Sequence, residues 1–194
     1  DDSFGAESVL GALRGLDKAG LKPLFLEKLD RAKPDLPHLA SVVAQAQPQA
    51  VIFIASAGTV AAGTKAIREA GSRAQVVTLS NNASGGFIKL LGEHARGVIV
   101  TQVFPYERSL AAPIVKEAAD LARAKGIPEV TPAMLEGFAG AKVLVEGLRR
   151  AGPNPTPARL VQALEGLRRY DIGGLEITYG PNNRSGLDYA DLSI

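Results

Sequence analysis

The most constraining feature of the sequence is a run of apolar, β-forming residues that passes through a turn of small residues into a helical pattern. It reads AVIFIASAGTVAAGTKAIREAG and spans residues 50–71. A strand that is almost continuously apolar is typical of a parallel sheet covered by helices on both faces. We therefore expect further strands and helices to alternate along the chain.

This alternation extends over about the first hundred residues. Hydrophobic periodicity, caps and breakers predict, in order, a helix at 4–19, a short strand within 21–30, a helix within 33–47, a strand at 50–56, a helix at 59–71, a strand at 75–80, a helix at 84–92 and a strand at 96–104. Gly71 is expected to close the third helix. In an α/β sheet, a helix like the one at 4–19 normally follows a strand. The sequence has no strand before that helix, so we expect it to be a piece of a longer protein.

The pattern changes at Pro105. Helices are predicted within residues 109–126, 133–152 and 156–167, the last with Thr156 as N-cap and Pro157 at the first helical position. The tail from residue 173 alternates apolar and polar residues around the turn signal GPNNRSG, which predicts paired strands. No long or Ser-rich linker accompanies the change, so Pro105 marks a candidate crossing between domains.

Composition excludes several classes of function. The chain has 194 residues, 46% of them hydrophobic, and a formal net charge of +2, with basic residues scattered among acidic ones. Nucleic acid is therefore not an expected partner. There is no cysteine, which removes disulfides and thiol chemistry, and the two histidines, His38 and His94, are expected to be solvated. No apolar run approaches the roughly 20 residues needed to span a bilayer.

Three short, polar loops are expected where ligands bind in open α/β sheets, beyond the carboxyl ends of the strands. They are DDSFG at 1–5, ASAGT at 55–59 and LSNNASG at 79–85. Their candidate contact residues are one aromatic and five hydrogen-bonding side chains: Phe4, Ser56, Thr59, Ser80, Asn81 and Asn82. Each residue could instead be an ordinary cap or turn former. The clustering of the three loops favours a binding site.

The same loops lack the groups that catalysis requires. No general base, carboxylate pair or lysine lies in the loops at 55–59 and 79–85. The Gly-x-Ser-x-Gly turn of serine hydrolases, the P-loop and the Gly-x-Gly-x-x-Gly fingerprint of dinucleotide folds are all missing. We therefore predict a protein that binds without reacting, is not an enzyme and uses neither metal nor cofactor.

Five stretches together cover nearly the whole chain: DDSFGAESVLGAL, PQAVIFIASAGTVAAGTKAIREAG, VVTLSNNASGGFIKLLGEHARGVIVTQVFPY, MLEGFAGAKVLVEGLRRAG and GLEITYGPNNRSGLDYADLSI. As a set, they resemble the periplasmic solute-binding proteins of the leucine/isoleucine/valine-binding family, which serve ABC transporters. The resemblance implies the type I periplasmic-binding-protein fold of the α/β class, with a parallel sheet flanked by helices. It also implies two lobes around a ligand cleft, the first lobe being incomplete in this chain.

The resemblance further implies a domain layout and a set of site residues. Residues 1–102 correspond to the second ligand-binding lobe without its first strand, 103–186 to a return segment of the first lobe, and 187–194 to a final strand back in the second lobe. The implied ligand-binding residues are Phe4, Ser56, Ala57, Ser80, Asn81 and Phe138. The implied hinge consists of Gln102, Val103, Phe104 and Pro105.

Two implied site positions depart from the family's usual residues. Ser80 and Asn81 fall on or beside the position where amino-acid-binding members carry an acidic residue that pairs with the ligand's ammonium group. A buried ammonium without a carboxylate partner is costly. Phe4 replaces the commoner tyrosine and so lacks its hydroxyl. Both departures favour a less cationic solute, such as an aliphatic or aromatic carboxylate, over an amino acid.

The resulting prediction is an extracytoplasmic solute-binding protein of an ABC importer. It is expected in the periplasm, as a monomer, with a small-molecule solute (an amino acid or a carboxylate) and a membrane permease as partners. The alternative is a ligand-sensing domain of a receptor or transcription regulator, since such proteins reuse the same fold.

Overall fold

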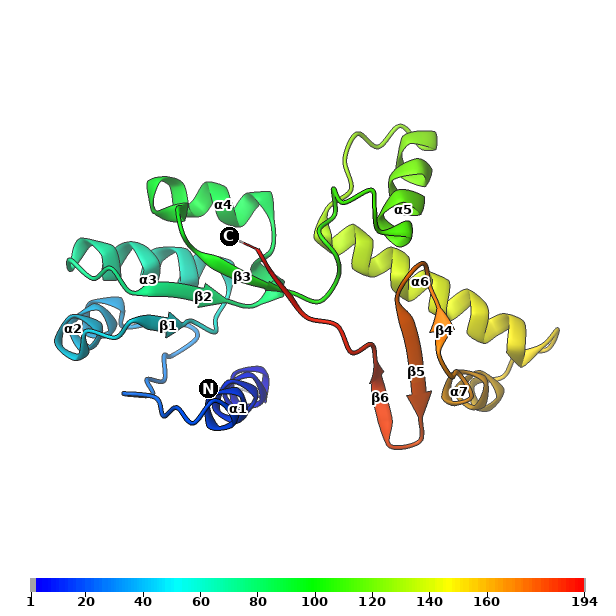
Figure 1. The fold of residues 1–194 in the computed structure, drawn as a ribbon, viewed down its shortest axis with the longest axis horizontal. Helices are drawn as coiled ribbons and strands as arrows, with labels where there is room; N and C mark the ends of the chain where they lie inside the picture. The colour runs from blue at the N-terminus through cyan, green and yellow to red at the C-terminus, as the bar shows by residue number, and fades with distance from the viewer. Residues whose placement is uncertain (1–2, 194) are drawn as a thin grey trace. The chain divides into compact units, whose positions relative to one another are not determined.

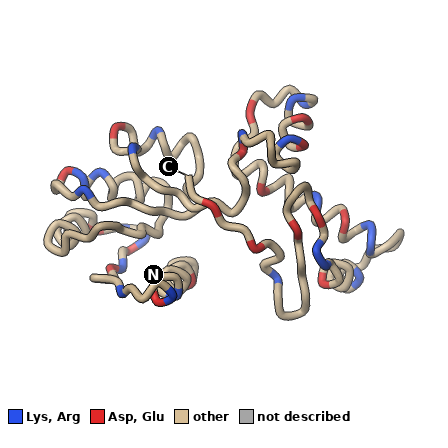
Figure 2. Tube along the Cα trace, in the orientation of Figure 1, with Lys and Arg blue, Asp and Glu red and all other residues tan. Residues whose placement is uncertain are grey.

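The computed structural model describes residues 3–193, which divide into two compact units (Figure 1). Unit 1 comprises residues 3–101 together with 192 and 193, and unit 2 comprises residues 102–191. Within each unit acidic and basic residues are interspersed along the chain (Figure 2). On one helix of unit 2, for example, Asp120 pairs with both Lys116 and Arg123.

Unit 1 is built on a four-stranded sheet. Its strands lie in the order β1 (Ala50–Ile52), β2 (Gln75–Thr78), β3 (Ile99–Gln102) and β7 (Asp191–Ser193). The β1–β2 and β2–β3 pairs are parallel, and Val51 lies opposite Val76 in the register. Because β1, β2 and β3 run in the same direction, the loops that follow β1 and β2 emerge at the same edge of the sheet.

Four α-helices and two short 3-10 helices accompany this sheet. They are α1 (Ser3–Lys18), α2 (Leu36–Ala46), α3 (Ala57–Glu69), η1 (Ser80–Asn82), α4 (Gly85–Leu91) and η2 (Gly92–Ala95). Side-chain oxygens of Asp35, Ser56 and Ser84 cap α2, α3 and α4, each accepting a backbone N–H in the first turn. After α3, Gly71 takes the left-handed conformation (φ +84°) that was expected to end it.

The core of unit 1 lies between the sheet and helices α2, α3 and α4. Its fully buried side chains include Val43, Val60, Ile67, Val76 and Phe87. Close packing at one point requires a glycine, because a Cβ built on Gly63 of α3 would lie 2.2 Å from Cε1 of Phe53. The ring of Phe53 thus occupies the space that a side chain at position 63 would need.

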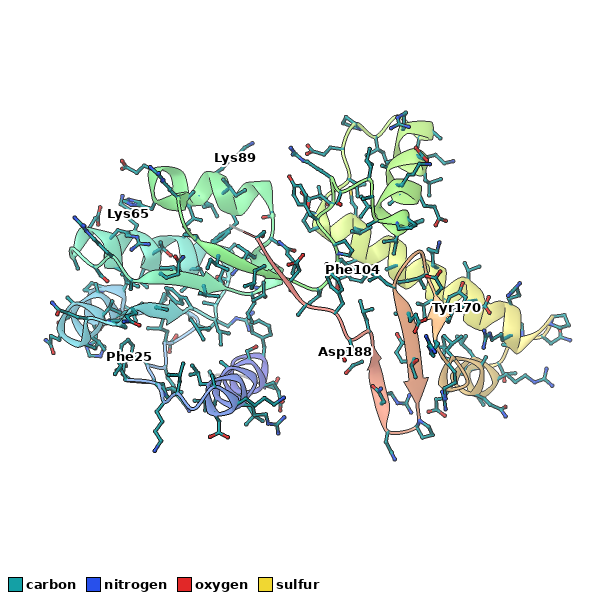
Figure 3. The ribbon with its side chains drawn as sticks, viewed as in Figure 1. Phe25, Lys65, Lys89, Phe104, Tyr170 and Asp188 are labelled. Carbon is teal, nitrogen blue, oxygen red and sulfur yellow. The ribbon has the colours of Figure 1, made fainter. Side chains whose placement is uncertain are left out.

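The strand predicted within residues 21–30 is wrong. The structure has no strand there: Phe25 (Figure 3) and Leu29 pack against the core of unit 1, while Leu24 is 70% exposed. Pro23 lacks a backbone N–H, and no strand in the described part of the chain pairs with this segment. The carboxylate of Asp30 then closes a turn by accepting the two backbone N–H groups at 32 and 33.

Unit 2 combines three helices with a small antiparallel sheet. Its elements are α5 (Pro113–Ala124), α6 (Pro132–Ala151), α7 (Pro157–Glu165), β4 (Tyr170–Asp171), β5 (Glu176–Gly180) and β6 (Asn183–Gly186). The sheet has the order β4-β5-β6, which confirms paired strands in the tail. Thr156 caps α7 by accepting the N–H of Arg159, and Pro157 opens the helix, as predicted.

The core of unit 2 joins α5 and α6 to the strands. Ile114, Val115, Leu135, Leu167 and Ile172 are fully buried in it. One ionised group is also buried. Glu146 on α6 is 5% exposed, and its carboxylate accepts hydrogen bonds from Arg149 at 3.0 Å and from Arg150 at 2.6 Å.

Candidate functional site

The candidate site lies at the carboxyl ends of β1 and β2, in the two loops that lead into α3 and α4. We call residues 53–59 and 78–85 the strand-end rim. None of these residues is charged, and the polar ones are serine, threonine and asparagine. The rim therefore presents neutral hydrogen-bonding groups in a place where parallel α/β sheets bind ligands.

The first loop of the rim begins α3. Ser56 is the N-cap: its hydroxyl oxygen accepts the backbone N–H of Thr59 at 3.4 Å and lies 3.0 Å from the hydroxyl of Thr59. Ala57 is the first residue of the helix. The first N–H groups of an α-helix have no partner within the helix and carry a partial positive charge, so they suit an anionic or carbonyl oxygen.

A buried hydrogen-bond network joins the second loop to the first. The side-chain amide of Asn82 donates to the carbonyl oxygen of Ala55 at 3.2 Å and to the hydroxyl of Thr78 at 2.9 Å. The Thr78 hydroxyl donates in turn to the carbonyl of Phe53 at 2.9 Å. Thr78 and Asn82 are buried, with 0% and 1% of their surface exposed. These two side chains hold the strand ends in register.

Two of the predicted contact segments are brought together by this network. Asn81 remains exposed, and its side-chain amide lies 3.5 Å from the carbonyl of Ala55, the residue before Ser56. The neighbouring residue, Ser80, begins η1. Ser56 with Ala57 and Ser80 with Asn81 are thus adjacent on the rim, and their contact with a ligand stays a prediction.

Sequence reasoning placed Asn82 among the polar groups available to a ligand and did not single out Thr78. The amide of Asn82 is instead committed to protein groups. One sequence signal could have shown this: a threonine that ends an apolar strand, followed four residues later by an asparagine. This signal does not identify the second acceptor of the Asn82 amide, because Ala55 is 27 residues away in sequence.

The two predicted aromatic contacts lie outside this network. Phe4 is in the first turn of α1 and is 47% exposed. Phe138 is on α6 of unit 2, where it packs partly buried against that unit's core. The ammonium nitrogen of Lys142 lies 5.5 Å from the centre of the Phe138 ring. Packing and this cation–π contact already account for the position of Phe138.

The predicted hinge residues follow β3, where the chain passes from unit 1 to unit 2. Gln102 is the last residue of β3, and Val103 is 41% exposed. Phe104 (Figure 3) packs partly buried against the core of unit 2, and Pro105 comes next. Their role as a hinge stays a prediction.

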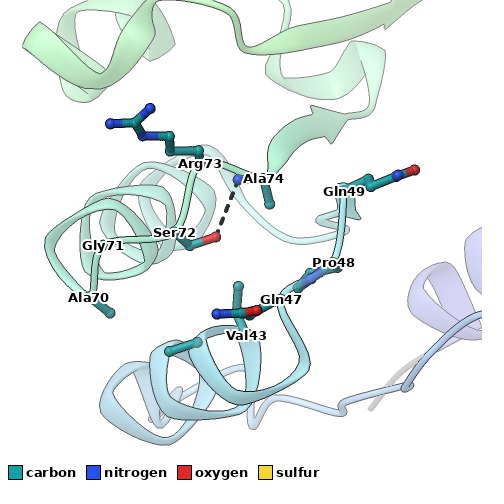
Figure 4. A pocket seen from close by; sticks show the side chains of 10 residues that line it. Val43, Gln47, Pro48, Gln49, Ala70, Gly71, Ser72, Arg73 and Ala74 are labelled. Carbon is teal, nitrogen blue, oxygen red and sulfur yellow. Dashed lines mark hydrogen bonds between the residues drawn. The ribbon is translucent and has the colours of Figure 1, made fainter.

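A hollow of about 410 Å³ lies at the other end of the unit 1 sheet. It is bordered by the carboxyl ends of α2 and α3 and by the residues that lead into β1 and β2 (Figure 4), among them Gln47, Pro48, Gln49 and Ala74. The hydroxyl oxygen of Ser72 accepts the N–H of Ala74 there at 3.2 Å. Because it lies at the amino ends of the strands, this hollow is separate from the rim.

Among residues 3–193, no three His, Asp or Glu side chains are grouped so that they could hold a metal ion. Within the same residues, no helix has the length and apolar character needed to cross a membrane.

Comparison with known proteins assigns this fold to a class. Residues 1–188 match the periplasmic binding protein family, and the chain belongs to that family. No curated protein matches the chain in sequence.

Solved structures agree with this assignment. A substrate-binding periplasmic protein from Ralstonia solanacearum is 29% identical, with a TM-score of 0.86 over 100% of this chain and 56% of its own. An extracellular ligand-binding receptor from Verminephrobacter eiseniae is 27% identical, with a TM-score of 0.70 over 84% of this chain and 47% of its own. A possible leucine/isoleucine/valine-binding protein from Rhodopirellula baltica, 22% identical, shares the fold with a TM-score of 0.84 over 99% of this chain and 54% of its own.

These findings confirm the resemblance and the type I fold predicted from the sequence. The chain spans about half the length of the structures that it matches. The resemblance is therefore to a part of a type I binding protein.

Proposed function

We propose that this chain is part of the solute-binding component of an ABC importer and that its strand-end rim contacts the polar group of a small solute. The protein would act outside the cytoplasm, bind its solute without chemical turnover and deliver it to a membrane permease. The observation that carries the proposal is the rim itself. Two loops of neutral polar groups are locked together by the buried Asn82 and Thr78 side chains, in a member of a binding-protein family.

The chemistry of the rim supports a solute whose contacting group is not a cation. A buried ammonium group needs a carboxylate beside it, and residues 53–59 and 78–85 contain none. A carboxylate is better matched, because hydroxyl, amide and helix N-terminal N–H groups all donate hydrogen bonds to it. We propose an aliphatic or aromatic carboxylate in preference to a free amino acid.

We propose the following roles for individual residues. The Ser56 hydroxyl would donate to the solute, with the backbone N–H of Ala57 beside it. The exposed side chain of Asn81, whose amide nitrogen also donates to Oδ1 of Asn82 at 3.2 Å and to the carbonyl of Ala55 at 3.5 Å, would contact the solute at the same place. Ser80 would add a second hydroxyl, and Phe4 would supply an apolar contact. Bending of the backbone at residues 102–105 would accompany binding, with Pro105 restricting the motion to its neighbours.

The proposed solute class can be tested by titration calorimetry on the complete gene product, with leucine compared with its deaminated analogue, 4-methylpentanoate. We expect the carboxylate to bind and the amino acid to bind at least tenfold more weakly. Tight binding of leucine without measurable binding of the analogue would contradict the solute class. Native mass spectrometry of the purified protein would show directly whether a small carboxylate co-purifies.

The proposed contacts can be tested with substitutions. Ser56→Ala and Asn81→Ala should each weaken binding about 10- to 150-fold, since a hydrogen bond to a charged group is worth about 1.5–3 kcal/mol. Ser185→Ala, at an exposed position of β6, is the matched control and should leave the affinity unchanged. Equal affinities for all three variants would show that Ser56 and Asn81 of the rim do not contact the solute.

A further inference from the structure

One side of α6 is exposed and apolar along most of the helix. We call Met134, Gly137, Ala141, Leu144, Val145 and Leu148 the open face of α6. The exposed fractions of its large side chains reach 48% for Leu144 and 65% for Val145. Positions 144 and 145 are adjacent, and all other successive positions lie three or four residues apart. These residues therefore form one stripe along the helix.

The opposite side of α6 is already packed within unit 2. Leu135, Ala139, Val143 and Gly147 are buried there. A Cβ on Gly147 would lie 2.7 Å from Cδ2 of Leu164 on α7, which places α7 against that side. At about 100° per residue, the buried set and the open face lie on opposite sides of the helix. The apolar character of α6 therefore extends to both sides, while unit 2 covers one.

Charge is missing from the open face. The charged residues of α6 are Glu136, Lys142, Glu146, Arg149 and Arg150, and none of them belongs to the stripe. Gly137 leaves open space, because a Cβ built on it meets no atom within 4 Å. A helix face in permanent contact with water is normally polar, and a helix that is apolar on both sides is normally buried. We therefore expect the open face to be covered by another apolar surface.

The length of the relatives indicates what covers it. This chain matches the Ralstonia protein with a TM-score of 0.86 yet accounts for 56% of that chain, so a large part of the relative has no counterpart here. We propose that the open face of α6 is the docking surface for a segment of the same gene product outside these 194 residues, which packs an apolar surface on Leu144, Val145 and Leu148. This inference rests on family membership and is independent of the proposed solute.

The chain has no cysteine, so a single introduced thiol reports on one position. In the complete gene product, the rate of maleimide modification is measured for Val145→Cys and, as a matched control, for Val161→Cys on α7. Val145 is 65% exposed and Val161 is 42% exposed in this structure, so an uncovered open face predicts the faster reaction at position 145. We expect the reverse order, with position 145 at least tenfold slower, and equal rates in urea.

Two results would overturn the inference. One is a reaction at position 145 as fast as at position 161, which would mean that the face is open to water. The other is protection that disappears on dilution, which would identify a second copy of the protein as the occupant. Leu144→Cys serves as a second reporter in case Val145→Cys perturbs folding. Since no solute is added, failure of the proposed solute class would leave this result unaffected.

Discussion

The side-chain amide of Asn82 donates a hydrogen bond to the carbonyl oxygen of Ala55 across 3.2 Å, which ties together the loops that follow two parallel strands. The same amide reaches the hydroxyl of Thr78. Because both loops belong to the strand-end rim, the geometry of the rim depends on a buried side chain that has no surface for a ligand to contact.

The first prediction concerns this buried amide. Asn82→Ala removes the donor and leaves the Ala55 carbonyl without that partner, which should lower the free energy of unfolding of unit 1 by about 1–3 kcal/mol. Asn81→Ala, at the exposed neighbouring position, removes only the longer hydrogen bonds of that amide, 3.2 Å to Oδ1 of Asn82 and 3.5 Å to the carbonyl of Ala55, and should cost less than Asn82→Ala. Differential scanning calorimetry separates the two cases. Equal losses would mean that the network does not hold the rim together.

The second prediction concerns the contact between α3 and Phe53. Gly63→Ala places a methyl group where the phenyl ring lies, 2.2 Å from Cε1, and should cost about 1–3 kcal/mol of stability through overpacking. Gly140→Ala in α6 meets no atom within 4 Å and should stabilise the helix by about 0.5–1 kcal/mol. Thermal denaturation followed by circular dichroism gives both values. A neutral Gly63→Ala would show that Phe53 can move aside.

The third prediction compares two glycines with nearly the same backbone. Gly186 and Gly126 have φ values of +74° and +72°. Alanine should cost about 1–2 kcal/mol at either position through backbone strain. At position 186 its methyl group would also lie 2.5 Å from the ring of Tyr179, whereas at 126 it meets nothing within 4 Å. Denaturant unfolding should therefore show a larger loss for Gly186→Ala, and similar losses would rule out the clash.

The fourth prediction is a dependence of stability on pH. Hydrogen bonds from Arg149 and then Arg150 hold the pKa of Glu146 below its ordinary value. The unfolded chain then binds the proton more readily, so the stabilisation is present above the ordinary carboxyl pKa and is lost as the pH falls through the folded-state pKa. Glu146→Gln should lower the melting temperature at pH 7, and its difference from the unmodified protein should shrink toward pH 3.

A control on the same helix makes this pH prediction specific. Glu136 is exposed on α6, and Glu136→Gln should have the same melting temperature as the unmodified protein at every pH. A constant difference between Glu146→Gln and the unmodified protein from pH 7 to pH 3 would show that Glu146 contributes through packing and not through its charge.

Short-range signals were sufficient for most elements of this protein. The caps at Ser56 and Thr156, the proline that opens α7 and the glycine that follows α3 act on neighbouring residues, so their effect is readable from the sequence. The alternation of apolar strands and helices likewise indicated a parallel α/β sheet, and the resemblance to a binding-protein family is confirmed.

Pairing and burial were decided by tertiary structure alone. Residues 21–30 carry the side-chain pattern of a strand, yet a strand forms only where another backbone supplies its hydrogen bonds, and none of the described strands does so. Asn82 looked like an available polar group until the fold placed the carbonyl of Ala55 beside it. The sequence by itself determined the local elements and their class, because those depend on contacts within a few residues. Only the tertiary structure decided which polar groups stay free on the rim, because their partners lie far apart along the chain.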